Sequence, residues 1–325
     1  MGLSNGPGEG FDASHPRGGK QVRIGYPCIN RSIGCTANHT FRLASYSGER
    51  LMATVAGNLA CLQKILSFNR DHGILFFRIT SDLVPFASHP VMDIPWQDRF
   101  LEQFREIGKF IRDSGIRVSM HPDQFILINA TEEAIVGRSI AELRYHAEVL
   151  DLMNLDTTAK VQIHVGGVYR DREASIRRFI ERTGGLDEAI LRLLAIENDD
   201  LRFPLADCLH IHGETGLPVV FDVFHHVLNN RGEPLPQALA AAAGTWKRAD
   251  GIPLVDYSSQ EIGKRRGTHA TVLDARLFRR FLLESRPFDI DIMLEIKDKE
   301  KSALEALGIA HGDPRLVSGN PGKRP

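Results

Sequence analysis

The chain has 325 residues, of which 42% are hydrophobic and 25% are charged, with a formal net charge of −1. This composition provides enough apolar surface for one large domain or two ordinary ones. The balanced charge argues against a protein that binds nucleic acid through a globally basic surface, although a local basic face would still attract phosphate.

Two further features bear on the cellular location. No apolar run reaches the roughly 18 residues that span a bilayer, and the N-terminus lacks the apolar core of a signal peptide. The cysteines, which form no CxxC pair and no metal-finger spacing, are Cys28, Cys35, Cys61 and Cys208. We therefore expect reduced thiols in a cytoplasmic protein that has no membrane partner.

The two ends of the chain differ in composition from the middle. Residues 1–20 are rich in Gly, Ser and Pro, which predicts a disordered N-terminal lead. Residues 308–325 predict a disordered tail for the same reason. We find no internal linker and no short-period repeat between them, so residues 21–307 are predicted to form a single domain.

Short apolar runs recur along this domain and predict buried strands. In chain order they are VRIGY (22–26), ILFFRI (74–79), RVSMH (117–121), KVQIH (160–164), LLAIEN (193–198), PVVFD (218–222), PLVDY (253–257) and DIMLEI (291–296). The segments between them have the helical period, as in 96–115, which ends at a glycine that favours a helix stop.

Apolar strands that alternate with helices indicate parallel strands buried on both faces. Eight such units in about 285 residues predict an α/β fold with a single (β/α)8 TIM barrel. A doubly wound open sheet is the alternative. The chain has no GxGxxG after the first predicted strand, which weakens a dinucleotide-binding version of that alternative.

The predicted strands deliver polar residues at their C-terminal ends, namely Tyr26, Arg78, His121, His164, Glu197, Asp222, Asp256 and Glu295. In a TIM barrel these ends converge on one face, where active sites are built. Each residue alone could be a turn residue or a helix cap. Because polar residues recur at matched positions in successive units, we predict a metal cluster at the C-terminal face of the strands.

The candidate ligands combine imidazole with carboxylate and include no thiolate; they are His89, His121, His164, Glu197, Asp222, His225, Asp256, His269 and Glu295. This set suits Mn²⁺, Zn²⁺ or Fe²⁺. Since one ion takes about four to six ligands, we expect two or three ions, with Glu197 as a bridging carboxylate. Clustered divalent ions are typical of phosphoryl chemistry. The residues assigned catalytic roles are Glu197, Asp222, His225 and Glu295.

Two basic segments follow predicted strands and suit a phosphate polymer as substrate. GKRRG (263–267) places Lys264, Arg265 and Arg266 between glycines, and YRDREASIRR (169–178) begins with Arg170 close to the fourth strand. Each segment alone could be a solvated surface. Their shared face of the barrel favours contacts with phosphate.

At this level of detail the chain resembles the ultraviolet damage endonucleases over residues 22–305, and more distantly the endonuclease IV group. The stretches that carry the resemblance are RIGYPCIN (23–30), RITSDLVPFASH (78–89), SMHPDQF (119–125), IHVGG (163–167), ENDD (197–200), FDVFHH (221–226) and LEIKDKEKSAL (294–304).

The resemblance implies incision of damaged duplex DNA immediately 5′ of cyclobutane pyrimidine dimers and 6-4 photoproducts. It implies Mn²⁺ as the preferred ion, Zn²⁺ or Mg²⁺ being alternatives. We expect a monomer because the mouth of the barrel must accept a duplex. The implied ligands are His89, His121, His164, Glu197, Asp222, His225, His269 and Glu295. The residues implied to probe the duplex and to fill the gap left by the flipped lesion are Tyr26, Asn30, Gln124 and Phe125.

Three positions depart from the family pattern. Leu254 stands where many members have a lysine that is carboxylated to bind an ion, and Asp256 stands in place of a histidine. Phe125 replaces a tyrosine and loses its hydroxyl group, and Asp123 occupies a position often held by glycine. We expect the third ion to bind more weakly or to be absent.

Two other classes of function remain open from the sequence. Sugar isomerases and epimerases of the xylose isomerase type use the same barrel with one or two ions, but they need no basic loops. A non-catalytic protein that binds lesions would be expected to lack ligands such as Glu197 or Glu295, and both are present.

Overall fold

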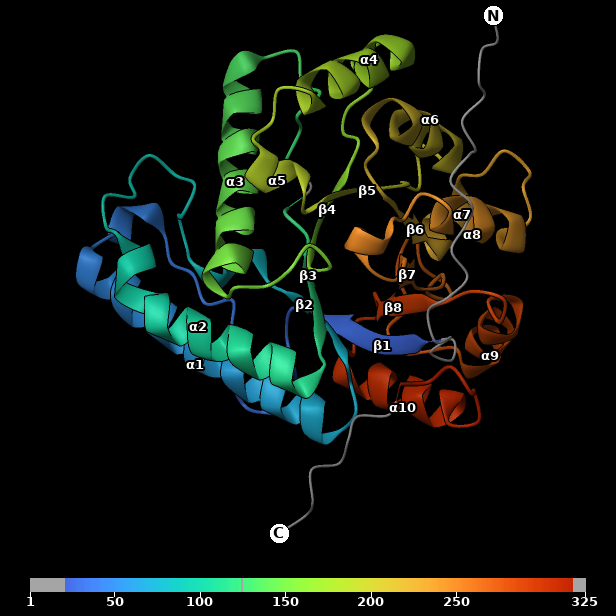
Figure 1. Cartoon of the computed structure of the whole chain (residues 1–325), viewed down its shortest axis with the longest axis horizontal. Helices are drawn as coiled ribbons and strands as arrows, with labels where there is room; N and C mark the ends of the chain where they lie inside the picture. Colours follow the sequence, from blue (N-terminus) through green and yellow to red (C-terminus); the bar gives the residue numbers. More distant parts are fainter. Residues whose placement is uncertain (1–20, 124, 318–325) are drawn as a thin grey trace, which may run out of the picture.

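The computed structural model describes residues 21–123 and 125–317. Parallel strands β1 to β8 close into a barrel in sequential order (Figure 1). The strands are β1 Val22–Pro27, β2 Phe76–Ile79, β3 Arg117–Met120, β4 Lys160–His164, β5 Leu194–Glu197, β6 Val219–Asp222, β7 Leu254–Tyr257 and β8 Ile290–Leu294. The predicted (β/α)8 TIM barrel is confirmed, and each strand falls close to its predicted apolar run.

Helices surround the barrel, with α1 to α3 on one side and α6 to α10 on the other (Figure 1). They are α1 Gly48–Asp71, α2 Trp96–Ser114, α3 Glu133–Leu152, α4 Arg172–Thr183, α5 Glu188–Leu191, α6 Leu205–Thr215, α7 Val223–Leu228, α8 Leu235–Ala243, α9 Ala275–Glu284 and α10 Glu300–Ala310. Short 3-10 helices cover Leu43–Ser45, Ser81–Leu83 and Arg248–Asp250. Gly115 ends α2 in the left-handed conformation that the sequence predicts for a helix stop.

The interior of the barrel is filled by a small apolar cluster that is separate from the main core between strands and helices. Its buried members come from five different strands and are Phe76, Ala195, Val220, Leu254 and Met293, with Trp246 packed against them. Since side chains alternate along a strand, the residues two positions further along the same strands also point into the barrel, toward its C-terminal end.

Helix α1 is long and apolar enough to cross a membrane by length and composition, contrary to our reading of the sequence. Its side chains Leu51, Val55 and Leu62 are buried in the main core, however, and so are Ile65 and Leu66. The helix therefore packs along the barrel as a core helix, and its apolar residues are explained by that burial.

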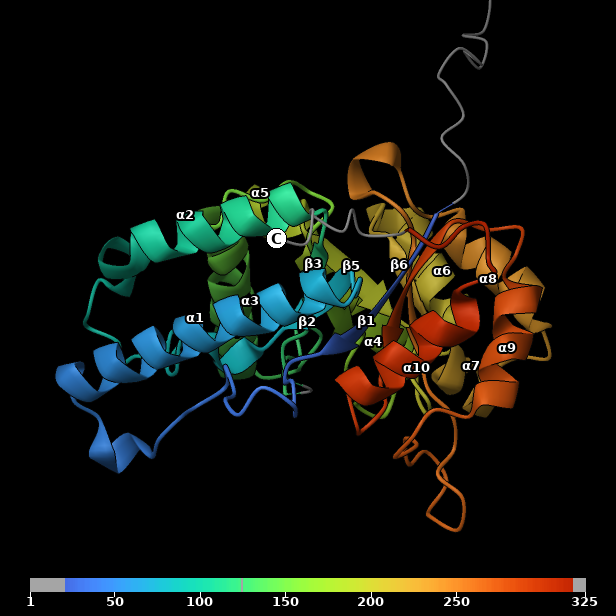
Figure 2. The ribbon, with the colours of Figure 1, turned by 90° about the horizontal axis from the view of Figure 1, so that it is seen from below.

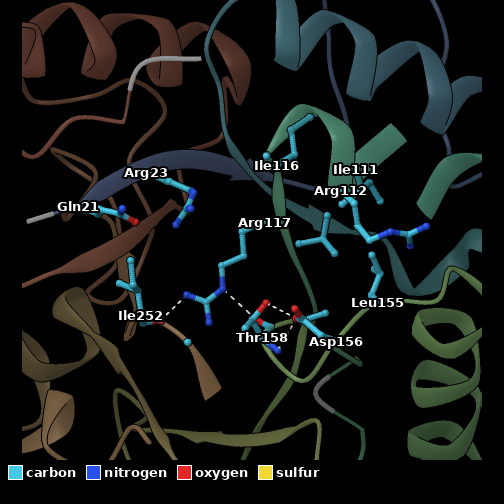
Figure 3. Close-up of a pocket in the computed structure, with 14 residues that line it drawn as sticks. Gln21, Arg23, Ile111, Arg112, Ile116, Arg117, Leu155, Asp156, Thr158 and Ile252 are labelled. Carbon is cyan, nitrogen blue, oxygen red and sulfur yellow. Dashed lines mark hydrogen bonds between the residues drawn. The ribbon is translucent and has the colours of Figure 1, made fainter. Parts of the chain in front are cut away.

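A cavity of about 430 Å³ lies at the N-terminal ends of the strands, beneath the interior cluster (Figure 3). Arg117 extends across it and donates hydrogen bonds to the carbonyl oxygens of Thr158, Asp250 and Ile252 and to the carboxylate of Asp291. Through these bonds the guanidinium links several strands and loops at the N-terminal end of the barrel.

The predicted disordered tail is wrong for residues 308–317. Helix α10 continues to Ala310, and Leu316 pairs in parallel with Val22. Arg315 is buried and donates hydrogen bonds to the carbonyl oxygens of Leu282, Ser285 and Phe288. One buried side chain thus fixes a segment whose composition resembles a loop. Residues 1–20 and 318–325 lie outside the described residues.

The prediction of four reduced thiols is wrong for Cys35 and Cys61, which form a disulfide. The loop after β1 folds back along α1 and brings their Cα atoms to 6.0 Å, a contact that a sequence separation of 26 does not reveal. Cys28 and Cys208 are free. Disulfides persist in oxidising compartments and in intracellular proteins of hyperthermophiles, so the cysteines give no support to a cytoplasmic location.

The fold makes one prediction about stability in acid. His146 is buried in α3, and burial lowers its pKa to about 4. In the unfolded chain the imidazole of His146 is protonated as the pH falls through about 6.5, whereas in the folded chain it stays neutral down to about pH 4. The contribution of His146 is therefore complete above about pH 6.5 and is lost as the pH falls toward 4, by about 3 kcal/mol.

Urea unfolding at pH 7 and pH 4.5 measures this contribution. In His146→Leu the loss of unfolding free energy between the two pH values shrinks by about 2–3 kcal/mol. The control is His210→Leu, because His210 is exposed on α6. An acid-induced loss in His146→Leu as large as in the unaltered chain would contradict the assignment.

Candidate metal centre

The strands position the polar cluster by simple alternation. Glu197, Asp222 and Asp256 each lie two residues after a member of the interior apolar cluster, on the same strand face. The register between β4 and β5 pairs His164 with Glu197 and so places the two side chains at the same level of the barrel. His121 follows directly after β3. The apolar layer thus supports a polar layer at the C-terminal end of the barrel, as predicted.

Glu197 is at the centre of this polar layer. Two groups of potential ligand atoms lie within 4.8 Å of one another, one formed by His121, His164 and Glu197 and the other by Glu197, Asp222 and His225. His121 Nε2 lies 3.2 Å from Glu197 Oε2, and His225 Nδ1 lies 3.3 Å from Glu197 Oε1. One carboxylate oxygen therefore faces each group, which is the arrangement of a bridging ligand.

The orientation of His121 is fixed by the backbone. Its Nδ1 lies 2.7 Å from the carbonyl oxygen of Pro122, which can only accept, so Nδ1 carries the proton. Nε2 faces Glu197 Oε2 at 3.2 Å, and it becomes a ligand atom when an ion displaces its proton. A ring nitrogen held in this way is a feature of metal-binding histidines.

The electrostatics of the cluster reflect its burial. Burial opposes the ionisation of Glu197, but His164, His121 and His225 outweigh it and hold its pKa well below the usual range. Burial also favours a neutral His225 ring, yet Asp222 and Glu197 raise its pKa to about 11. Protonated imidazole thus balances the carboxylates, and a bound cation would displace those protons.

Two buried atoms in the cluster lack hydrogen-bond partners within the described residues, and they provide a test of whether a cation fits. They are Asp222 Oδ2 and His164 Nδ1. Burial raises the pKa of Asp222 well above its usual range. An unpartnered carboxylate oxygen surrounded by imidazole and a second carboxylate suits a divalent ion, because such an ion takes N and O ligands together.

Asp256 belongs to neither group, and its predicted role as a ligand stays a prediction. Both of its oxygens accept hydrogen bonds from Arg78 Nη2, at 2.8 and 2.7 Å, and Gln162 donates to Oδ2 at 2.6 Å. Arg78 Nη1 also bonds to Glu295. Burial alone would lower the pKa of Arg78, but Asp256 and Glu295 raise it instead.

Glu295, predicted to be a metal ligand, forms an ion pair with Arg78 in this structure. Although burial opposes its ionisation, Arg78 lowers the pKa of Glu295 to about 2. His269 Nδ1 lies 3.0 Å from the carbonyl oxygen of Glu295, and the His269 ring is 5.9 Å from the His225 ring. His269 thus lines the cluster without belonging to either group of ligands.

His89 lies apart from both groups. It is exposed, and its Nδ1 accepts a hydrogen bond from the backbone N–H of Val91 at 3.0 Å. His226 packs against Phe221, with its ring centroid 5.1 Å from the phenyl ring.

The predicted DNA contacts of Tyr26 and Asn30 stay a prediction. Both side chains are buried, the Tyr26 hydroxyl donates to Asn69 Oδ1 at 2.7 Å, and Asn30 Nδ2 donates to that hydroxyl at 2.9 Å. This network joins β1 to α1. Gln124 lies outside the described residues. Phe125 is 74% exposed in the loop after β3.

The basic residues predicted to contact DNA are exposed, namely Arg170, Lys264, Arg265 and Arg266. Arg265 lines a cavity of about 370 Å³ together with His121, His164 and His225. The loop that carries it, between β7 and α9, projects away from the barrel in Figure 2. The same loop exposes 92% of Ile262.

Three contributors to the site were not predicted from the sequence. Arg78 was recognised as a strand end but not as a cation that pairs with two carboxylates. Gln162 donates to Glu197 as well as to Asp256, and its position two residues before His164 on an alternating strand could have indicated this. Lys299 follows the last strand in the charged run KDKEK.

The fold and the cluster define a class of protein, a TIM barrel with a carboxylate-centred, histidine-rich group at the face where such enzymes bind metal. The family model described as UV-endonuclease UvdE matches residues 22–311. The UV DNA damage endonuclease of Clostridium perfringens is 35% identical over 288 residues, which are 88% of this chain and 70% of that protein. The chain belongs to the UV-endonuclease UvdE family, which confirms the resemblance seen in the sequence.

Solved structures agree with this assignment. The crystal structure of SacUVDE has 45% sequence identity and a TM-score of 0.86, over 90% of this chain and 98% of that one. The 3-keto-D-glucoside 4-epimerase YcjR of E. coli has a TM-score of 0.52 at 13% identity, over 89% of this chain and 98% of that one. The second likeness shows a common fold alone.

The geometry predicts that Glu197 controls metal binding. In Glu197→Gln both groups lose their shared carboxylate charge, so the affinity for Mn²⁺ falls by 100-fold or more, on the order of 3 kcal/mol. Isothermal titration calorimetry of the purified chain measures this affinity. Glu142→Gln is the control, since Glu142 is partly buried on α3 and outside both groups. Equal Mn²⁺ affinities for Glu197→Gln and the control would contradict the role of Glu197.

Proposed function

We propose that this chain is a metal-dependent DNA repair endonuclease that nicks duplex DNA immediately 5′ of ultraviolet photolesions. Cyclobutane pyrimidine dimers and 6-4 photoproducts are the proposed lesions. The observation that carries the proposal is the pair of ligand groups sharing Glu197, at the active face of a barrel whose family is that of the UV endonucleases.

The proposed ligands are His121 and His164 for one ion and Asp222 and His225 for the other, with Glu197 common to both. Divalent ions bound there, Mn²⁺ above all, would activate water and stabilise negative charge on the attacked phosphate. The protein orients these ligands by its own contacts. Asp222 Oδ1 accepts from the His225 backbone N–H at 2.7 Å, and Asn198 fixes the Asp222 backbone from both sides.

Around this centre we assign the DNA contacts to exposed residues on strand-end loops. Phe125 presents a ring that can fill the gap left by an extruded dimer, which offsets the lost stacking. Lys264, Arg265 and Arg266 are positioned to neutralise backbone phosphates. The partner is damaged duplex DNA, bound by a monomer in the cytoplasm at the nucleoid.

Nicking of a labelled duplex with one defined pyrimidine dimer tests the proposal. With Mn²⁺ we expect a single cut immediately 5′ of the dimer, leaving a 3′-hydroxyl and a 5′-phosphate, and with chelator no cut. An intact duplex and an abasic-site duplex are run beside it. Cutting that persists in chelator, or an uncut dimer duplex with Mn²⁺ present, would contradict the proposal.

A further inference from the structure

Backbone strain in this protein is concentrated at the end of the barrel that carries the polar cluster. Among the described residues, non-glycine residues with positive φ are Cys28, Phe86, Asn154, Tyr169, Arg170 and Lys299. All of them except Asn154 lie in segments that follow a strand. Residues in such conformations persist where the surrounding structure holds them, and they gather at functional sites.

Lys299 has the most informative of these conformations. Its φ of 61° and ψ of −116° belong to the second position of a type II′ turn, where glycine is preferred. The turn is closed by a hydrogen bond from Lys301 N–H to the Asp298 carbonyl oxygen. Glycine would adopt this turn without strain, so the lysine is retained at a cost in stability.

The Lys299 side chain faces the active end of the barrel. It lines a cavity of about 440 Å³ together with Cys28, Arg78, His121, His269 and Glu295. No described residue forms a hydrogen bond or an ion pair with its ammonium group. Burial lowers the pKa of Lys299 and outweighs the opposing effects of Cys28 and Glu295, while Arg78 and Arg31 act in the same direction as burial.

Glu295, the carboxylate that shares this cavity, does not account for the lysine. Glu295 is bonded directly to Arg78, which already supplies the positive charge that it needs. Lys299 is therefore a second cation, half-buried and held by a strained turn, beside a carboxylate that is already paired. A site of this kind is suited to an anion that arrives from outside.

We propose that Lys299 is a catalytic residue that binds a non-bridging oxygen of the phosphodiester being cut. The inference rests on the proposed function, since it takes the anion to be the DNA phosphate. The ammonium would donate hydrogen bonds to that oxygen and stabilise the charge that grows on it during hydrolysis. Loss of one such donor lowers the rate of comparable reactions by about 10²–10³-fold.

The test compares variants of the full chain loaded with Mn²⁺. Lys299→Met removes the donor, Lys299→Arg restores a cation, and Lys301→Met is the matched control because Lys301 is an exposed lysine two residues further on. Single-turnover nicking of the dimer duplex falls about 100-fold in Lys299→Met. It recovers in part in Lys299→Arg and is unchanged in Lys301→Met.

A second readout is independent of nicking. Binding of inorganic phosphate to the Mn²⁺-loaded chain, followed by calorimetry, weakens about tenfold in Lys299→Met and stays unchanged in the control. If the unaltered chain does not nick DNA but Lys299→Met still weakens phosphate binding, the anion site is supported and only the endonuclease proposal is contradicted. Unchanged nicking and unchanged phosphate binding in Lys299→Met would overturn the inference.

Lys299→Gly separates function from folding. Because glycine relieves the strained turn, its thermal midpoint equals or exceeds that of the unaltered chain, while nicking falls as in Lys299→Met. A variant that is at least as stable and yet inactive is the result expected for a residue kept for chemistry. A lower midpoint together with a parallel loss of Mn²⁺ would assign Lys299 a structural role and contradict the proposal.

Discussion

The buried guanidinium of Arg78 is the interaction on which the rest of the site depends. It lies inside the barrel and joins β2 to Asp256 of β7, to Gln162 of β4 and to Glu295 after β8. A buried charge is tolerated only when it is paired and hydrogen-bonded, and removing one partner leaves the others uncompensated. Arg78 thus balances two carboxylates that would otherwise repel each other and Glu197.

This pairing divides the polar layer into two parts. On one side Asp256 and Glu295 are neutralised by the protein's own cation. On the other side Glu197 and Asp222 lie among His121, His164 and His225. Against the effect of burial, the carboxylates raise the pKa of His121 and of His225, and a metal ion would displace the protons of those two rings. Beneath Asp256, Leu254 belongs to the interior apolar cluster, and its side chain offers no ligand atom. We propose that this chain holds two ions around Glu197, while Arg78 supplies the positive charge that a third ion would bring to Asp256 and Glu295.

The sequence allowed the barrel to be predicted because strands buried on both faces are continuous apolar runs, and because polar residues ended those runs at matched positions. The same logic identified Glu197, Asp222 and His225, since strands adjacent in sequence are adjacent in the barrel. It failed where the outcome depends on which polar groups satisfy each other. Nothing in a single strand tells that Arg78 reaches Asp256, 178 residues away.

The sequence also did not reveal which polar residues would be buried in the core. Tyr26 ends a strand as the ligands do, but its ring lies in the core against Phe77 and its hydroxyl finds Asn69 on α1. The disulfide between Cys35 and Cys61 likewise depends on how one loop folds back. The proposed role of Lys299 could not be predicted, because it is inferred partly from a left-handed backbone conformation that the charged run KDKEK does not reveal.

Anomalous diffraction from crystals of the Mn²⁺-loaded chain tests the two-ion claim most directly. The account predicts two manganese peaks, one between Glu197 and the pair His121 and His164, the other between Glu197 and the pair Asp222 and His225. Arg78 remains bonded to Asp256 and Glu295. A manganese peak bound to Asp256 or Glu295, with the Arg78 side chain displaced, would contradict it.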